Sequence, residues 1–189
     1  MTDVNLNFWL SKNVIVIPTP PDDTTEIGPL DLLNDKPILQ HTYENAGMLK
    51  RGEVIIATPS RITANYCSEA GWFWRPVNAT YDNDIDRIRD VVHRFRRNLT
   101  IESIVYWPWF RPFLPPGRTR LLIKKALEDR VTSWLVDTDG VPLLGVYPLD
   151  VLKGGSGELE NLIYDETIPP ALTAEGLDAV SDYLTNFEG

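Results

Sequence analysis

Apolar residues recur with helical spacing over residues 81–97, and this is the clearest pattern in the chain. The apolar positions are Tyr81, Ile85, Ile88, Val92 and Phe95. Residues three and four apart lie on one face of a helix. Acidic residues crowd the first turns of this segment and arginines crowd the last, as the helix dipole favours. The pattern predicts an amphipathic helix that packs its apolar face on a sheet.

Two further segments are predicted to be helical. Thr119–Arg130 and Thr173–Phe187 both begin at a threonine, a residue type that caps helix N-termini well. The second segment repeats apolar residues at intervals of three and four. We therefore expect about three helices.

Runs rich in β-branched and aromatic residues predict the strands. They are Asn13–Ile17, Glu53–Thr58, Gly71–Val77, Thr100–Trp107, Val131–Asp137 and Val141–Tyr147. Glycines and prolines punctuate residues 36–80, which we interpret as short strands throughout. These elements predict an α+β fold, with a mixed or mainly antiparallel sheet of five to seven strands and extended proline-rich arms. The alternation of helices and strands after residue 80 would also permit an α/β sheet.

The domain organisation follows from the first prolines. Residues 1–35 are predicted to form an N-terminal strand and an extended acidic arm, because Pro18, Pro20 and Pro21 end the strand. Residues 36–189 are predicted to form a single α+β domain. The N-terminus lacks the features of a signal peptide, and no apolar run is long enough to span a membrane. We expect an intracellular, cytoplasmic protein or a component of a virus particle assembled there, with no membrane partner.

The residue types that make common cofactor and metal sites are scarce. Cys67 is the only cysteine and the chain has two histidines, which argues against a disulfide scaffold and the usual zinc sites. The Gly154–Gly157 segment lacks the lysine and helix of a phosphate-binding loop. No set of catalytic residues can be nominated from spacing. The sequence predicts no cofactor, no metal and no catalytic residue.

One short segment points to chemistry. Residues 134–143 (WLVDTDGVPL) place Asp-x-Asp-Gly after an apolar strand. This segment resembles the first motif of the haloacid-dehalogenase-like phosphatases. The resemblance implies Asp137 as a nucleophile and Asp139 as an acid and base. The alternative interpretation is a β-hairpin whose turn uses Asp and Gly for their conformational tolerance.

Charge is segregated along the chain. Residues 87–130 contain 11 basic and four acidic residues, so this segment carries +7 although the whole chain carries −9. Arg94, Arg96 and Arg97 are the candidate contacts for an acidic face on another subunit. Binding of nucleic acid by this segment is less favoured, because the overall charge opposes approach to a polyanion. The alternative is that these charges pair within one chain or are solvated.

Aromatic residues and prolines concentrate after the predicted strand Thr100–Trp107. The candidate partner-binding residues are Trp107, Trp109, Phe110, Arg111 and Phe113. The prolines prevent regular pairing of the backbone, so the segment is expected to run over a surface, where exposed aromatics favour a covering partner. The alternatives are a loop folded over its own core and a site that stacks a nucleotide or a sugar.

The function favoured by these features is non-enzymatic. Charge segregation, aromatic arms and the lack of a catalytic set suggest a structural or interaction protein, a subunit of a larger assembly. A bacteriophage virion component of the connector, neck, tail-terminator or baseplate type has this general character. Its partners would be copies of itself or a neighbouring assembly protein. The alternatives are a small phosphoester hydrolase that uses Asp137 and Asp139, and an intracellular adaptor that binds one protein.

Overall fold

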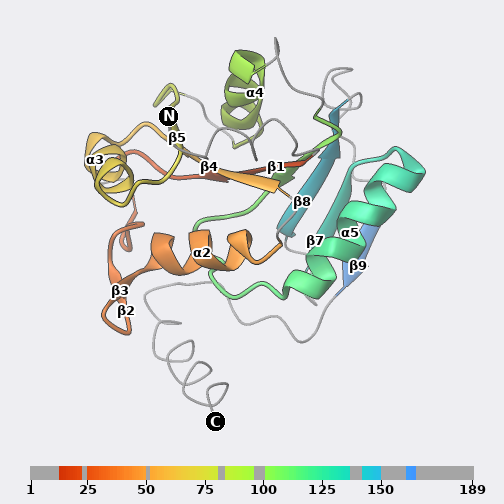
Figure 1. The fold of residues 1–189 in the computed structure, drawn as a ribbon, viewed down its shortest axis with the longest axis horizontal. Coiled ribbons are helices and arrows are strands. Elements are labelled where there is room, and N and C mark those ends of the chain that lie inside the picture. Colours follow the sequence, from red (N-terminus) through yellow and green to blue (C-terminus); the bar gives the residue numbers. More distant parts are fainter. Residues whose placement is uncertain are drawn as a thin grey trace.

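A single seven-stranded sheet organises the protein (Figure 1). The computed structural model describes residues 13–22, 25–49, 52–80, 84–95, 101–136, 142–149 and 161–164. The strands are β1 (Asn13–Pro18), β4 (Gly52–Thr58), β5 (Trp74–Pro76), β6 (Ser103–Tyr106), β7 (Ser133–Val136), β8 (Pro142–Pro148) and β9 (Asn161–Tyr164). Their order in the sheet is β5-β4-β1-β6-β8-β7-β9.

Most of the strand pairs are parallel. β1 pairs in parallel with β4 on one side and β6 on the other, β4 pairs in parallel with β5, and β7 with β9. Only β8 runs against its neighbours, β6 and β7. The prediction of a mixed sheet with five to seven strands is confirmed. The α+β assignment with a mainly antiparallel sheet is wrong, because helical crossovers join parallel strands and make the fold α/β.

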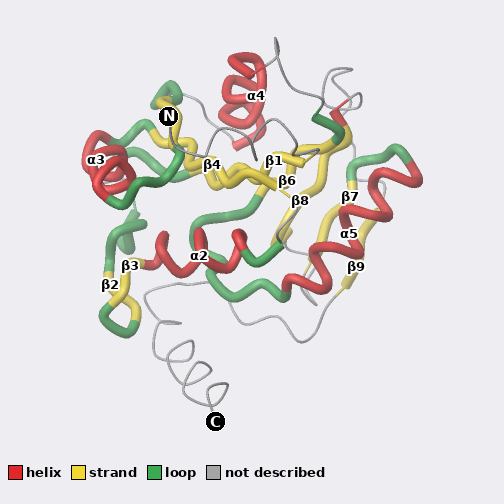
Figure 2. The backbone as a smooth tube through the Cα atoms, viewed as in Figure 1, coloured by secondary structure: helices red, strands yellow, loops and turns green. Residues whose placement is uncertain are grey.

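The helices cover both faces of the sheet. They are α2 (Ile38–Gly47), α3 (Arg61–Glu69), α4 (Asp84–Phe95) and α5 (Pro116–Asp129). In the view of Figures 1 and 2, α4 lies above the sheet, α2 lies below it, and α5 lies at the right beside β7. Residues of α2 and α5 belong to the same buried group. Two separate groups of buried apolar side chains result, one on each face. The described part of the chain therefore has three layers.

The side chains of strand β1 are buried on both faces of the sheet. Ile15 and Ile17 pack into the group between the sheet and helices α2 and α5, and Val14 and Val16 pack into the group between the sheet and α4. A strand buried on both faces reads as a continuous apolar run, as β1 does. On α4, Ile88 is buried as the helical spacing predicted. The helix predicted over 81–97 is thus confirmed for α4.

The prediction that residues 36–80 form only short strands is wrong, because α2 and α3 lie there. The buried faces of these helices consist partly of small or hydroxyl residues, such as Thr42 and Ala46 on α2 and Thr63 and Ala64 on α3. Their apolar periodicity is therefore weak. A local signal for the start of α3 is nevertheless present in the sequence. Ser60 is the N-cap, and its hydroxyl accepts a hydrogen bond from the Thr63 backbone N–H.

Helix α5 begins earlier than predicted. Its N-cap is Pro115, not Thr119, and Thr119 is buried inside the helix with its hydroxyl 3.3 Å from the Pro115 carbonyl oxygen. A proline fits the first helical turn because the backbone N–H it lacks would have no partner there. The predicted helix Thr173–Phe187 lies outside the described residues.

A small hairpin lies between β1 and α2. β2 (Leu32–Leu33) pairs antiparallel with β3 (Lys36–Pro37) around Asn34 and Asp35, whose φ angles are 49° and 61°. Positive φ at both central residues is typical of a tight hairpin turn. The described helices include none with the length and apolar character to cross a lipid bilayer.

Candidate functional site

The strand order reverses between β1 and β6. From β1 the chain passes through α2 to β4, which lies on the side of β1 away from β6. From β6 the chain passes through α5 to β7, which lies on the side of β6 away from β1. In open α/β sheets, ligands bind outside the carboxyl ends of the strands at such a reversal. Two segments meet at this edge: residues 19–22 after β1, and residues 107–115 after β6. We define this region as the carboxyl edge of the sheet.

Hydroxyl groups join the ends of β1 and β4. The Thr19 hydroxyl donates to the Thr58 hydroxyl oxygen across 2.7 Å, and the Ser60 backbone N–H donates to the same Thr58 oxygen across 3.1 Å. All three side chains are buried. The ends of two neighbouring parallel strands are thus held together by side chains as well as by the sheet.

Ser60 extends this connection to an acidic residue. Its hydroxyl donates to the Asp22 carboxylate and accepts from the Thr63 N–H at 2.9 Å. Asp22 is exposed, whereas Ser60 is buried. The segment after β1 is therefore linked to the first turn of α3, and one carboxylate is held at the carboxyl edge.

The segment after β6 folds back on itself. The Trp107 N–H donates to the Val16 carbonyl oxygen at 3.0 Å, so this residue still lies beside β1. The Trp107 indole Nε1 donates to the Arg111 carbonyl oxygen at 2.9 Å, and the Arg111 N–H donates to the Pro108 carbonyl oxygen at 3.1 Å. These bonds fix a turn over residues 107–111.

Helix α2 supplies hydrogen bonds that the prolines prevent the segment from making by strand pairing. The Thr42 hydroxyl lies 2.6 Å from the Trp109 carbonyl oxygen, in position to donate. The Asn45 amide donates to the carbonyl oxygens of Pro112 and Leu114 at 2.8 and 2.9 Å. Buried carbonyl groups need such partners. The 107–115 segment is therefore fastened to α2 along its length.

The aromatic residues predicted from the sequence pack inward. Trp107 and Trp109 are buried, Arg111 is 6% exposed, and Phe110 and Phe113 are partly buried against the same apolar core. These five side chains are brought together, and the segment folds over its own core, as one of the alternative interpretations held. Contact between these residues and a partner is not tested by the structure and stays a prediction.

The arginines predicted to bind a partner lie apart from this edge in the sequence. Arg94 falls within α4, but its side chain, Arg96 and Arg97 lie outside the described residues. Several other basic residues of the 87–130 segment pair within their own helices. The pairs are Arg89–Asp86 at 3.4 Å, Lys124–Glu128 at 3.7 Å and Lys125–Asp129 at 4.0 Å. Part of the predicted basic surface is thus neutralised locally.

The Asp-x-Asp-Gly segment separates two paired strands. β7 and β8 run antiparallel, with Val136 opposite Pro142. This pairing confirms that the two strands form a hairpin, while the predicted role of Asp and Gly in its turn lies outside the described residues. Asp137 and Asp139 themselves lie outside the described residues. Among residues that are described, no group of three His, Cys, Asp or Glu side chains is placed to hold a metal ion.

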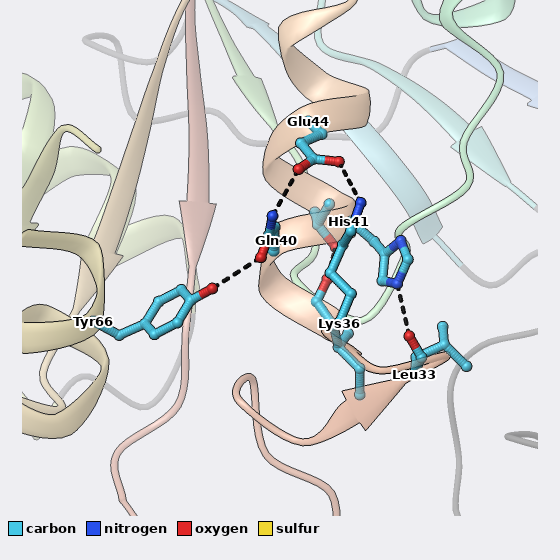
Figure 3. A network of polar contacts seen from close by, with 8 residues as sticks. Leu33, Lys36, Gln40, His41, Glu44 and Tyr66 are labelled. Atoms are coloured by element: carbon cyan, nitrogen blue, oxygen red, sulfur yellow. Dashed lines mark hydrogen bonds and ion pairs between the residues drawn. The ribbon is translucent and has the colours of Figure 1, made fainter. Parts of the chain in front are cut away.

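A second polar cluster lies on α2, α3 and the β3 strand (Figure 3). The Glu44 carboxylate accepts from Lys36 Nζ at 2.9 Å and from the Gln40 amide at 2.8 Å, and the Tyr66 hydroxyl donates to Gln40 at 2.9 Å. Burial alone would raise the pKa of Glu44, but these hydrogen bonds and the nearby positive charges outweigh it and lower that pKa. The cluster joins α2 to α3 through a chain of side chains.

The histidine and cysteine of this region have structural positions. His41 Nε2 lies 2.8 Å from the Leu33 carbonyl oxygen, and its ring packs against Phe113. Cys67 is buried, and burial raises the pKa of its thiol to about 12. A thiol with such a pKa stays protonated at neutral pH and is a poor nucleophile.

Comparison with solved structures shows what this arrangement resembles. Over 94% of this chain and 100% of the other, the fold superposes on a CMP:2-keto-3-deoxy-manno-octonic acid synthetase complexed with CTP, with a TM-score of 0.77 and 18% identity. A 4-diphosphocytidyl-2C-methyl-D-erythritol synthase from Anaerococcus prevotii matches over 93% and 99% of the two chains, with a TM-score of 0.66 and 11% identity. The chain has the fold of these enzymes.

A third similar structure contains a metal. It is Rv0371c of Mycobacterium tuberculosis in complex with manganese, which matches over 91% of this chain and 99% of its own, with a TM-score of 0.65 and 12% identity. No protein-family model matches the sequence, and no curated protein matches it significantly. The likeness therefore lies in the fold.

These findings overturn the functional prediction. A non-enzymatic virion subunit of the tail or connector type is wrong, because the proteins that share this fold over their whole length include two synthetases. One feature that suggested an assembly protein has an internal explanation, because the proline–aromatic segment is part of the core at the carboxyl edge. The prediction that the protein is not an enzyme is corrected on the same basis.

Sequence reasoning missed the residues that join β1 to β4. Thr19, Asp22, Thr58 and Ser60 come from segments that were interpreted as an acidic arm and as short strands. One signal could have found them, because a buried strand ending in Thr58 is followed at once by Ser60 and the helix it caps. A strand, a short turn and a capped helix are typical of an α/β sheet.

Proposed function

We propose that this protein is a nucleotidyltransferase that binds a cytidine nucleotide at the carboxyl edge and transfers its cytidylyl group to a sugar-derived acceptor. The observation that carries the proposal is the likeness, over nearly the whole chain, to a synthetase complexed with CTP. The two synthetases described above both have cytidine nucleotides in their names, which favours CTP over other triphosphates.

The reaction class is a displacement at phosphorus. A hydroxyl oxygen of the acceptor forms a bond to the α-phosphorus of CTP, and the bond from that phosphorus to the bridging oxygen of the β-phosphate breaks. Pyrophosphate leaves with the electron pair, and the hydroxyl proton passes to solvent. Enzymes accelerate such transfers by positioning the reactants and stabilising negative charge.

The two segments at the carboxyl edge have distinct roles in this proposal. Residues 19–22 are linked through Thr58 and Ser60 to β4 and α3, so they form a fixed wall on the β1 side. Residues 107–115 are fastened to α2 and form the wall on the β6 side. The nucleotide would lie between two segments that are rigid before it binds, which reduces the cost of ordering the site.

Because the similar structure of Rv0371c contains manganese, we compared the side chains at the carboxyl edge with the ligands that a divalent ion needs. Hard divalent cations need several oxygen ligands. Within the described residues of the two segments, the ionisable side chains are Asp22, which already accepts from Ser60, and the cation Arg111. This donor set does not fit a divalent ion, so we route no step of the transfer through one.

The proposal is tested by pyrophosphate release from CTP, with 2-keto-3-deoxy-manno-octonic acid as acceptor, and with ATP, GTP and UTP as competing donors. We expect release with CTP only in the presence of acceptor. Asp22→Ala should reduce kcat/KM about 10-fold or more, because the β1 segment loses its link to Ser60.

Asp129→Ala is the matched control. Asp129 is an exposed carboxylate at the end of α5, which leads into the amino end of β7, away from the carboxyl edge. This variant should keep the wild-type activity. Failure of all four triphosphates to bind to the folded protein would contradict the proposed function.

A further inference from the structure

A positively charged residue lies in the segment that follows β6 at the carboxyl edge, where the proposed function places the nucleotide. Arg111 follows β6 at the point where the strand order reverses, and only 6% of its surface is exposed. We propose that Arg111 binds the phosphates of the nucleotide, and that nucleotide binding at this site therefore does not require a divalent cation. This inference rests on the proposed function and concerns its site.

Burial makes this charge effective. A guanidinium taken out of water is costly unless negative groups or acceptors surround it. In the same low-dielectric surroundings, its attraction for an anion is stronger than at an exposed position. A buried arginine at a ligand-binding edge is thus a strong attractor for a phosphate group.

The backbone of Arg111 is held before any ligand arrives. Its N–H donates to Pro108 and its carbonyl oxygen accepts from the Trp107 indole. Its guanidinium carbon lies 5.8 Å from the centre of the Phe110 ring, within range of a cation–π contact. Trp109 packs edge-on against the same ring at 5.7 Å. The charge is therefore anchored by its own segment.

The guanidinium has donors for more than one partner. It carries five N–H groups in a planar fork, so it can contact a phosphate through two of them and keep contacts within the protein through the others. The same positive charge repels a divalent cation that approaches this segment. The Arg111 guanidinium thus supplies the positive charge for phosphate binding on the β6 side of the carboxyl edge.

The direct test is the affinity of the full-length wild-type protein for CTP, measured by titration calorimetry. The titration is done in about 1 mM EDTA and again in about 5 mM MgCl2, and CMP serves as a second probe. We expect the two CTP dissociation constants to agree within about twofold, because arginine–phosphate contacts do not involve the metal. CMP has fewer phosphates and should bind more weakly in both buffers.

Arg111→Gln tests the residue itself. Loss of a charge-assisted contact should weaken CTP binding about 10- to 100-fold, and Arg111→Lys should restore part of it, because lysine keeps the charge without the fork. Arg120→Gln is the control: it removes the same charge from an exposed position on α5, where the side chain donates to the Met48 carbonyl oxygen. It should bind CTP as the wild type does.

The comparison of the two buffers decides whether CTP binding depends on magnesium. If the wild type binds CTP only with magnesium, this inference is overturned and the proposed function stands. Equal CTP affinity of a folded Arg111→Gln variant and the wild type would also overturn it. Absence of CTP binding in both buffers would overturn the proposed function and this inference together. The wild-type comparison decides the metal question even where Arg111→Gln does not fold.

Discussion

The side-chain amide of Asn45 on α2 donates to the carbonyl oxygen of Leu114 across 2.9 Å, joining residues 69 positions apart. The same amide also donates to Pro112 at 2.8 Å. One polar side chain thus satisfies two carbonyl groups of a segment whose prolines prevent strand pairing. It connects the first half of the sheet to the β6 side of the carboxyl edge.

Asn45→Ala should therefore destabilise the protein. Two carbonyl groups lose their donors, at a cost of roughly 1–3 kcal/mol. Asn65→Ala is the control, because Asn65 is exposed on α3; it should change the free energy of unfolding by no more than about 0.5 kcal/mol. Urea unfolding followed by circular dichroism measures both. Equal stabilities of the two variants would show that the Asn45 bonds contribute nothing net.

Gly145 on β8 lies directly opposite Trp134 on β7. A Cβ atom at position 145 would lie 3.1 Å from the Trp134 ring, closer than packed carbons normally approach. Gly145→Ala should cost about 1–3 kcal/mol, because the indole must move within a filled core where it also packs edge-on against Tyr106 and Tyr147.

Gly117→Ala is the matched substitution in open space. Nothing lies within 4 Å of a Cβ atom built at Gly117, and the residue is helical. This variant should be as stable as the wild type or more stable by up to about 1 kcal/mol, since alanine favours helix over glycine. Thermal unfolding of both variants provides the test, and a destabilised Gly117→Ala with a neutral Gly145→Ala would contradict the packing described.

Glu53 on β4 makes stability depend on pH. Burial raises the pKa of its carboxyl group above the ordinary value of 4.5. The charged form is therefore disfavoured in the folded state, and folding is penalised once the pH rises through the folded pKa. Glu53→Gln removes the charge. It should be more stable than the wild type at pH 7.5, and the difference should vanish as the pH falls below 4.5.

Denaturant unfolding at several pH values between 3.5 and 7.5 measures this difference. Glu69→Gln is the control. Glu69 is exposed at the end of α3, and its replacement by Gln changes the net charge by the same amount as Glu53→Gln. A constant difference between Glu53→Gln and the wild type across this range would show that the Glu53 carboxyl group is not the cause.

The Cys67 thiol should be protected in the folded protein. It is buried, and its pKa of about 12 leaves little thiolate at pH 8. Modification by a disulfide reagent should be at least about 100-fold slower in the native protein than in the denatured chain. The colour released by the reagent follows the reaction. Rapid modification of the native protein would mean that α3 opens readily.

Local patterns were sufficient for elements whose burial is strongly apolar. β1, β4 and β6 are β-branched runs, and α4 presents apolar residues at intervals of three and four. The turn chemistry after residue 136 indicated the β7–β8 hairpin. In each case the side chains that face the core are neighbours within one element, so the chemistry of a short segment decides the structure.

Helices α2 and α3 were beyond such patterns. Thr42 and Thr63 are buried although they are polar. The Thr42 hydroxyl lies within hydrogen-bond distance of the Trp109 carbonyl oxygen, and the Thr63 backbone N–H donates to the Ser60 hydroxyl. A short sequence window does not show the Trp109 partner of Thr42, which lies on another segment. Tertiary contacts override weak local preferences in this way.

The sequence by itself determined where most strands lie, where α4 and α5 lie, and that an aromatic, proline-rich segment follows β6. Only the tertiary structure decided that the strands are mainly parallel, and that this segment packs inward beside β1. It also brought Arg111 to the same edge as Asp22. The physical reason is that element type depends on side chains a few positions apart, whereas strand order and burial depend on contacts between residues separated by much of the chain.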